Sequence, residues 1–282
     1  MHLDKHGYVS IVELVVFIPC LILGVVVCLR HGFKRTSGWI FVLILSAIRI
    51  AGAVCQLLTY NNPTEGLIKA TLILDSIGIA PLLLTVLGVL SRLVDWINGS
   101  IQNPKINSKI FRIIQLVIGV SLILGIVGVT SPKSQAADGA FIPPTISKVG
   151  IILNIVVFIV ITIIFMLSLS HGTAVPRPER LLRVHIPIAL VAIAIRLLYS
   201  TLCIFVHDST FSLFDGSIVA NVLMAIVEEF FVVIITLALG FKLRASLEMQ
   251  SEVVNLNKSR DNDGHNPRSR DGVDEEPSNS GF

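Results

Sequence analysis

Five charged side chains lie in the interior of long apolar stretches of this sequence. They are Arg49, Asp75, Arg196, Glu228 and Glu229. An arginine keeps its charge at any physiological pH, whereas a carboxyl can hold or release a proton. In an apolar setting, guanidinium and carboxyl groups can form ion pairs, bind a polar ligand or pass protons. Which of these roles applies depends on the elements that position the five residues.

The composition indicates that lipid rather than water surrounds most of the chain. Of the 282 residues, 53% are hydrophobic and only 15% are charged, whereas globular domains carry about 25% charged residues. Residues 1–250 hold 18 basic and 12 acidic residues, and residues 251–282 hold 4 and 7. The sequence therefore predicts a mildly basic membrane domain and an acidic tail. The tail is rich in Pro, Gly, Asn and Ser, so we expect it to be disordered.

Seven stretches are long and apolar enough to cross a bilayer, which takes about 20 helical residues. They cover residues 9–29, 38–60, 66–91, 111–131, 147–169, 184–206 and 218–240. Polar connections separate them, as backbone that leaves the hydrocarbon requires. The first stretch is too long for the apolar region of a cleaved signal peptide, so we expect it to be retained. The predicted fold is an all-α membrane protein, a seven-transmembrane helix bundle.

The distribution of Lys and Arg predicts the orientation of this bundle. With the N-terminus outside and the C-terminus inside, twelve Lys and Arg residues fall in the inner connections or at the span ends beside them. Only four fall on the outer side. Because inner loops of membrane proteins are enriched in basic residues, this orientation is favoured. The sequon Asn98-Gly99-Ser100 would then lie inside, and we expect it to stay unglycosylated.

In this topology the five charges reach a similar depth. Each lies about nine to twelve residues from an end of its span, which is near the bilayer centre. A charge there costs at least about 2.5–3.5 kcal/mol unless it pairs or faces water. The simplest pairing joins consecutive spans: Arg49 with Asp75, and Arg196 with either Glu228 or Glu229. The two glutamates project about 100° apart, so one is left over, and we expect it to be neutral.

Two interpretations of the charges stay open. They can be ion clamps that hold the bundle together, or they can line a polar cavity that binds a ligand or relays protons. Asn154 and Asn221 are candidates to line the same cavity, although each can equally form a hydrogen bond between helices. Glu13 lies close to the outer end of its predicted span. We expect it to reach the surface or to line an outer vestibule.

No motif points to catalysis, a cofactor or a metal. The sequence has no HExxH, GxSxG or phosphate-binding loop, and no histidine lies at mid-membrane. We therefore expect no catalytic residues, no cofactor, no metal site and no enzymatic activity. No basic patch with interleaved aromatics indicates nucleic-acid binding. Cys55 and Cys203 both lie near outer ends of their spans, which leaves a disulfide between them as an alternative.

Two stretches carry a resemblance to known families, namely HGFKRTSGWIFVLILSAIRIAGA (31–53) and LDSIGIAPLLLTVLGVLSRL (74–93). With them, most of residues 8–245 resembles a fungal family of seven-span integral membrane proteins without an assigned function. Residues 74–93 are also similar to one helix of the fungal RTA-type lipid-translocating exporters, which implies export of a lipid or amphiphile. No site residues come with either resemblance. The usual receptor signatures are missing, since Ser91-Arg92-Leu93 replaces Asp/Glu-Arg-Tyr.

Together these features favour a multi-pass protein of the plasma membrane or an endomembrane. The leading hypothesis is that it binds or translocates a lipid or small amphiphile through a charged midplane cavity. One alternative is a sensor or receptor that contacts a cytosolic partner through its basic inner loops and tail. A second alternative is a structural scaffold. Membrane lipids are partners in all three hypotheses.

Overall fold

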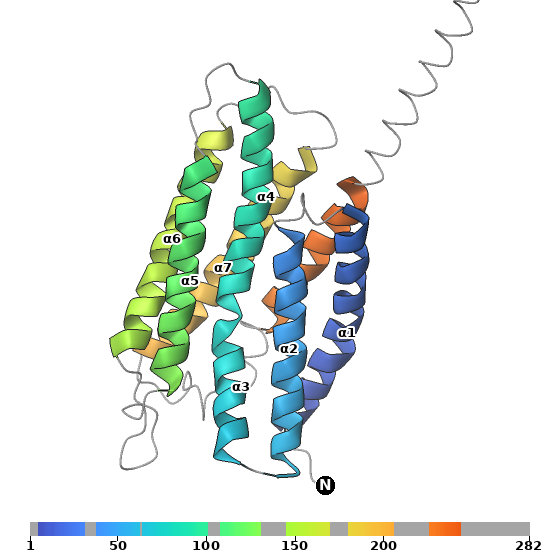
Figure 1. Ribbon diagram of the computed structural model, residues 1–282, viewed down its shortest axis with the longest axis vertical. Coiled ribbons are helices and arrows are strands. Elements are labelled where there is room, and N and C mark those ends of the chain that lie inside the picture. The colour runs from blue at the N-terminus through green and yellow to red at the C-terminus, as the bar shows by residue number, and fades with distance from the viewer. Residues whose placement is uncertain are drawn as a thin grey trace, which may run out of the picture. The chain divides into compact units, whose positions relative to one another are not determined.

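The computed structural model of the protein describes residues 5–31, 38–62, 64–100, 108–130, 145–169, 180–205 and 226–243. All of them belong to one compact unit, Met1–Leu243 (Figure 1). Every regular element in these ranges is a helix: α1 (Lys5–His31), α2 (Trp39–Thr59), α3 (Glu65–Ile77), α4 (Ile79–Ser100), α5 (Ser108–Thr130), α6 (Thr145–Leu169) and α7 (Arg180–Phe205). A last helix covers residues 226–243. The predicted tail, residues 251–282, lies outside the described residues.

Six stretches within the described ranges are long and apolar enough to cross a membrane. They are Gly7–Leu29, Trp39–Thr59, Glu65–Asn98, Lys109–Thr130, Thr145–Leu169 and Leu181–Phe205. The chain is therefore an all-α protein with the helices of a multi-pass membrane protein. The last helix falls in the seventh predicted span, of which residues 218–225 lie outside the described ranges. The count of seven spans and the orientation of the termini stay predictions.

The third predicted span consists of two helices, α3 and α4, which are separated at Gly78. Pro81 explains the position of this break. Proline has no N–H, and its ring collides with the carbonyl four residues earlier, here that of Ile77. Beyond the break, α4 continues to Ser100, past the predicted end at residue 91. The predicted end of the span was set where the apolar run ends. The helix itself continues beyond that run, because backbone hydrogen bonding does not depend on apolar side chains.

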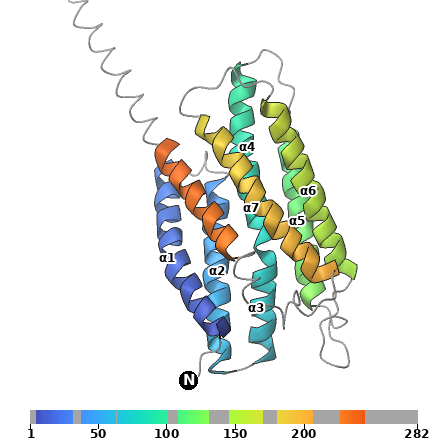
Figure 2. The same ribbon diagram turned by 180° about the vertical axis from the view of Figure 1, so that it is seen from behind.

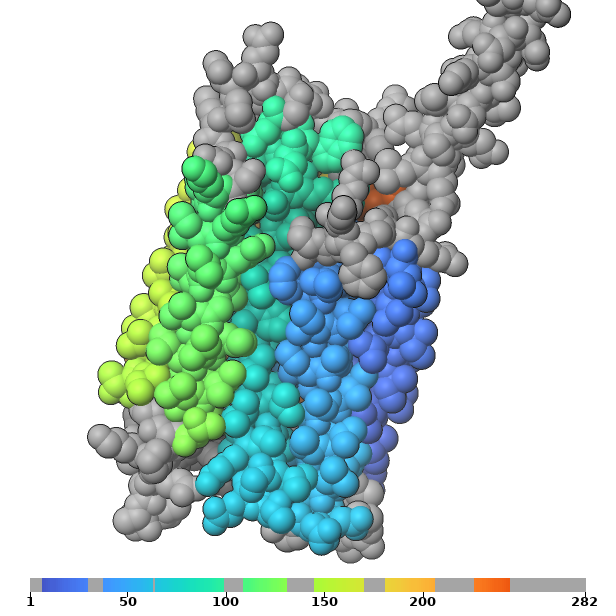
Figure 3. All heavy atoms as spheres, in the orientation of Figure 1, coloured from blue at the N-terminus to red at the C-terminus, as the bar shows by residue number. Residues whose placement is uncertain are grey.

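Helix α4 forms the centre of the bundle. It packs against α2, α5, α6 and α7, and the space-filling view shows it recessed between α2 and α5 (Figure 3). Its fully buried side chains include Leu82, Leu83, Val86, Leu87 and Leu90. Seen from behind, α7 crosses the bundle at a slant (Figure 2). This arrangement brings the middle of α7 close to the break between α3 and α4, which positions the candidate site.

The outer helices present apolar side chains to their surroundings. Examples are Val15 of α1, Leu116 of α5 and Ile163 of α6, all of which are more than half exposed. In water such faces would be unfavourable, whereas in a bilayer they contact lipid tails. Between α5 and α6 the packing depends on small residues. A Cβ added to Gly150 would lie 3.3 Å from the carbonyl oxygen of Ser121, so the two backbones approach closely, as is common between membrane helices.

Candidate functional site

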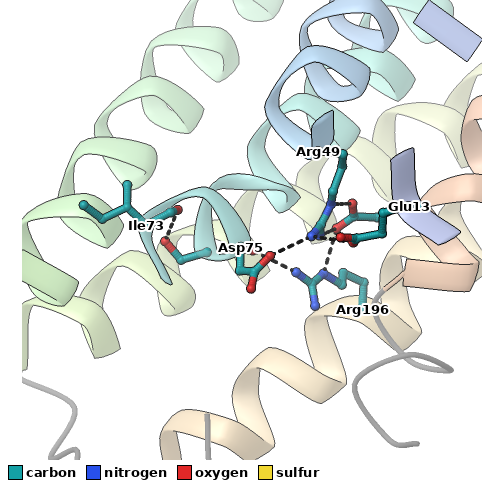
Figure 4. Close-up of polar contacts among 7 residues, drawn as sticks. Glu13, Arg49, Ile73, Asp75 and Arg196 are labelled. Atoms are coloured by element: carbon teal, nitrogen blue, oxygen red, sulfur yellow. Dashed lines mark hydrogen bonds and ion pairs between the residues drawn. The ribbon is translucent and has the colours of Figure 1, made fainter. Parts of the chain in front are cut away.

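The centre of the candidate site is an ion pair between Arg49 of α2 and Glu229 of the last helix. The Nε and Nη2 groups of Arg49, whose side chain is labelled in Figure 4, donate to the two carboxylate oxygens of Glu229. This fork is the strongest arrangement available to an arginine and a carboxylate. The side chains are 4% and 0% exposed. Arg49 is thus held in place by a residue from the far end of the sequence.

The remaining nitrogen of Arg49 reaches two more carboxylates. Its Nη1 donates to Oδ1 of Asp75 at 3.0 Å, and it lies 3.6 Å from Oε1 of Glu13. The Asp75 side chain is 45% exposed, in contrast to its partner. The predicted pair of Arg49 and Asp75 is therefore present. Arg49, however, is shared by three carboxylates, one each from α1, α3 and the last helix.

Arg196 of α7 completes the cluster. Its Nε lies 3.2 Å from Oε1 of Glu229, and its Nη2 donates to the backbone carbonyl of Asp75 at 3.2 Å. That carbonyl belongs to the last four residues of α3, whose carbonyls have no partner within their own helix. The break between α3 and α4 therefore supplies an acceptor for Arg196. Of the two candidate glutamates for Arg196, the partner is Glu229.

Glu228 is the carboxyl left over from this pairing. No ion pair joins it to another described residue, and its buried Oε2 atom has no hydrogen-bond partner among them. The neighbouring Glu229 takes both arginines because the two side chains leave the helix in different directions. The structure thus brings Arg49, Asp75, Arg196 and Glu229 together and leaves Glu228 apart from them.

Glu13 was expected to reach the surface or to line an outer vestibule. The expectation of contact with the surface is wrong, whereas Glu13 does line a cavity together with residues of α2 and α3. The residue is 7% exposed and belongs to the cluster around Arg49. The physical reason is that α1 begins at Lys5 rather than at residue 9, so Glu13 lies more than two turns inside its helix. The hydropathy profile marks the start of the apolar run, which does not coincide with the start of the helix.

Gly78 is a residue of the site that the sequence analysis did not identify. A Cβ at this position would lie 2.5 Å from Oε1 of Glu229 and 3.0 Å from Nη2 of Arg49. Only the absence of a side chain allows the break between α3 and α4 to approach the ion pair so closely. The signal for this site in the sequence was a glycine that lies three residues before a proline within the third predicted span.

Beside the cluster, a cavity of about 130 Å³ lies between α3, α4, α5, α6 and α7; we call it the larger cavity. Its polar lining comprises Asp75, Ser76, Ser121, Ser147, Asn154, Arg196, Tyr199, Ser200 and Cys203, and its apolar lining includes Leu72, Ile79, Leu122, Ile151 and Ile204. The hydroxyl of Ser121 donates to Oδ1 of Asn154. Asn154 therefore has both expected roles, since it links α5 to α6 and faces the cavity. Asn221 lies outside the described residues.

A smaller cavity of about 60 Å³ lies between α1, α2, α3 and the last helix. Its lining consists of Val9, Ser10, Glu13, Arg49, Gly52, Gln56, Thr71, Asp75 and Ile226. Asp75 is the residue common to the two cavities. Both cavities lie in the half of the bundle where α2 ends and α3 begins. Asp75 thus takes part in the lining of both cavities.

Other reactive side chains lie outside this cluster. In the ranges that the structure describes, no three His, Cys, Asp or Glu side chains are placed to hold a metal ion. His185 is buried against the hydroxyl of Thr236 at 2.9 Å. Cys55 and Cys203 are both free thiols, so the disulfide that the sequence left open is not formed.

Comparison with known proteins gives one match. No curated protein and no solved structure matches the chain. A family model described as "Domain of unknown function (DUF7702)" matches residues 3–246, which span all the described helices and leave out most of the acidic tail. The chain therefore belongs to this family of unknown function.

Proposed function

We propose that the protein binds a small amphiphile, with the polar head of the ligand in the larger cavity. The observation that carries this proposal is the mixed lining of that cavity. Asp75 and Arg196 are among its polar lining residues, and Leu122 and Ile151 are among its aliphatic ones. A mostly apolar pocket with a few placed polar groups is the usual form of a small-molecule site.

The polar lining residues offer both signs of charge. Asp75 uses one carboxylate oxygen for Arg49, and its side chain is 45% exposed. Arg196 supplies a guanidinium, and Ser121, Asn154 and Ser200 supply groups that hydrogen-bond. Such a lining suits a head group that carries donors as well as acceptors, for example a zwitterion, an amine or a hydroxylated group. An apolar ligand would leave these groups without partners, which is unfavourable.

The volume limits what can enter. The cavity has a volume of about 130 Å³. Sites for drug-sized ligands measure about 300–1,000 Å³. The cavity therefore suits a head group, and the tail of the ligand would extend beyond it toward the bilayer. Translocation, the extension of this proposal, would require the cavity to widen.

A second candidate function, a structural scaffold, has one observation in its favour. The ion pair of Arg49 and Glu229 is buried and joins α2 to the last helix, as a clamp would. The similarity of residues 74–93 to a helix of fungal RTA-type lipid-translocating exporters favours the amphiphile instead. The receptor alternative depends on inner loops and a tail that lie largely outside the described residues. The geometry of the site therefore gives no support to this alternative.

The proposal can be tested by binding to the purified full-length protein in lipid nanodiscs. The probes are a fluorescent lysophosphatidylcholine, a fluorescent long-chain amine and a fluorescent fatty acid. Ser200→Phe places a large ring in the cavity lining without removing a charge, and we expect it to weaken binding of the responsive probe at least tenfold. Leu198→Phe is the matched control, since Leu198 lies two residues away on α7 and faces outward, 55% exposed. Absence of binding by all three probes, or equal binding by both variants, would count against the proposal.

A further inference from the structure

The buried cluster contains more carboxyls than guanidiniums. Glu13, Asp75 and Glu229 all contact Arg49, and Glu229 also contacts Arg196. Three carboxylates and two guanidiniums would leave one uncompensated negative charge in the interior of the bundle. Burial of an unpaired charge is unfavourable, so one further positive charge or one proton has to complete the cluster.

We propose that a single exchangeable proton completes it, shared between Glu13 and Asp75 at the smaller cavity and held mainly by Glu13. Neither the family match nor the sequence assigns a role to Glu13. The proton site follows from the geometry of the cluster and does not depend on the proposed binding of an amphiphile.

The contacts of the three carboxyls point to Glu13 as the main holder of the proton. Glu229 accepts two hydrogen bonds from Arg49 and lies beside Arg196, so its charge is the best compensated. Asp75 accepts one hydrogen bond from Arg49 at 3.0 Å. Glu13 is 3.6 Å from the same nitrogen, and its buried Oε1 has no hydrogen-bond partner among the described residues. Of the three carboxyls, Glu13 therefore loses the least electrostatic stabilisation when it becomes neutral.

Four charged groups act on Glu13 electrostatically. Arg49 of α2 is the nearest at 3.6 Å, and the others are Asp75 of α3, Arg196 of α7 and Glu229 of the last helix. The two arginines already pair with Asp75 and Glu229. A change in the protonation of Glu13 therefore alters the balance of the whole cluster.

The smaller cavity gives the proton a place to exchange. Its volume of about 60 Å³ has room for about two water molecules. Ser10, Gln56 and Thr71 line it together with Glu13 and Asp75, which provides the polar partners that a buried water needs. It lies toward the beginning of α1 and the end of α2. A proton can thus reach Glu13 from that end of the bundle and pass to Asp75.

A metal cation fits this position less well than a proton. Nη1 of Arg49 already lies within 3.6 Å of Glu13 and 3.0 Å of Asp75, so a positive group occupies the space where both carboxylates converge. A sodium ion would have to approach this guanidinium and collect several oxygen ligands. A proton binds to one oxygen and needs no such shell.

Infrared difference spectroscopy of the full-length protein in nanodiscs, titrated with pH, tests the proposal directly. We expect a carbonyl stretch of a protonated carboxyl at neutral pH that shifts in D₂O and disappears at high pH. Uniform incorporation of ¹³C-glutamate should shift this band in the unsubstituted protein, so the central test requires no variant to fold. A band that does not shift on ¹³C-glutamate incorporation, or the absence of any such band, would overturn the assignment.

Variants then identify the residue. Glu228 is also expected to be neutral, so two glutamic acids contribute to the band. Glu13→Gln should remove one component of it, and Asp75→Asn should remove the same component, because removal of one carboxylate leaves the cluster balanced without a proton. Glu65→Gln is the control and should keep both components, since the side chain of Glu65 is 90% exposed and pairs with Lys69 on the surface. An unchanged band in Glu13→Gln, loss of the whole band in Glu228→Gln, or thermal stabilisation by NaCl but not by KCl would contradict the proton site.

Discussion

Arg49 and Glu229 are 180 positions apart in the sequence and form a two-pronged, buried ion pair. Their contact closes the bundle, because it joins the second helix of the chain to the last helix that the structure describes. Asp75 and Arg196 attach to this pair from α3 and α7. Any function of the site therefore has to operate next to a contact on which the fold itself depends.

Neutralising Glu229 should destabilise the protein severely. In Glu229→Gln, Arg49 loses a charged partner and Arg196 loses its ion pair, and a broken buried pair costs about 3–5 kcal/mol. We expect a large drop in the thermal unfolding midpoint of the purified protein and a loss of the monodisperse peak in size-exclusion chromatography. Glu228→Gln is the matched control and should stay within about 1 kcal/mol of the parent, because no partner is lost. Equal damage from both substitutions would argue that the pairing of Glu229 is not the cause.

A methyl group at Gly78 should disturb the site without removing any charge. In Gly78→Ala the new Cβ would lie 2.5 Å from Oε1 of Glu229, so the ion pair or the break between α3 and α4 has to shift. Overpacking of this kind costs about 1–3 kcal/mol. Gly119→Ala is the control, since nothing lies within 4 Å of its added Cβ. We expect Gly119→Ala to unfold at or above the parent temperature. A Gly78→Ala protein as stable as the parent would show that the cluster tolerates displacement.

The pairs of the cluster were predictable because depth along a transmembrane helix is proportional to residue number. Arg49 and Asp75 had to lie at a similar level, and the short connection between their spans brought them to neighbouring helices. The choice of Glu229 over Glu228 was not predictable in this way. It depends on the rotation of the last helix about its axis, and a helix that is apolar on all sides carries no periodic signal from which that rotation could be read.

The position of Glu13 and the break at Gly78 were missed for a different reason. Both depend on where backbone hydrogen bonding begins or stops, which hydropathy does not record. The two cavities depend on how side chains from all the described helices fill the space between them. A sequence lists candidate lining residues such as Asn154, but it does not say where their packing leaves room.

The orientation of the bundle can be measured by cysteine labelling in intact cells. In a variant without the four native cysteines, Asn61→Cys in the α2–α3 connection should react with a membrane-impermeant maleimide from outside. Asp95→Cys, near the end of α4, should react only after permeabilisation. Both positions are exposed, so protection reports the membrane rather than burial. The reverse pattern, or a glycan on Asn98, would overturn the predicted placement of the N-terminus outside.

Asp75→Asn should separate a binding site from a clamp. Asp75 is the most exposed member of the cluster at 45%, and Arg49 keeps its fork to Glu229 when the Asp75 charge is removed. We therefore expect an unfolding free energy within about 1 kcal/mol of the parent, as for a partly exposed ion pair. Binding of the amphiphilic probe that responds in the parent should fall at least tenfold, because the charged acceptor in the larger cavity is gone.

The clamp alternative predicts the opposite outcome for Asp75→Asn. If Asp75 serves only to hold α2 against α3, Asp75→Asn should unfold as readily as Glu229→Gln, and the fraction that stays folded should bind the probe as tightly as the parent. Unfolding midpoint and probe binding, measured on the same three proteins, distinguish these outcomes.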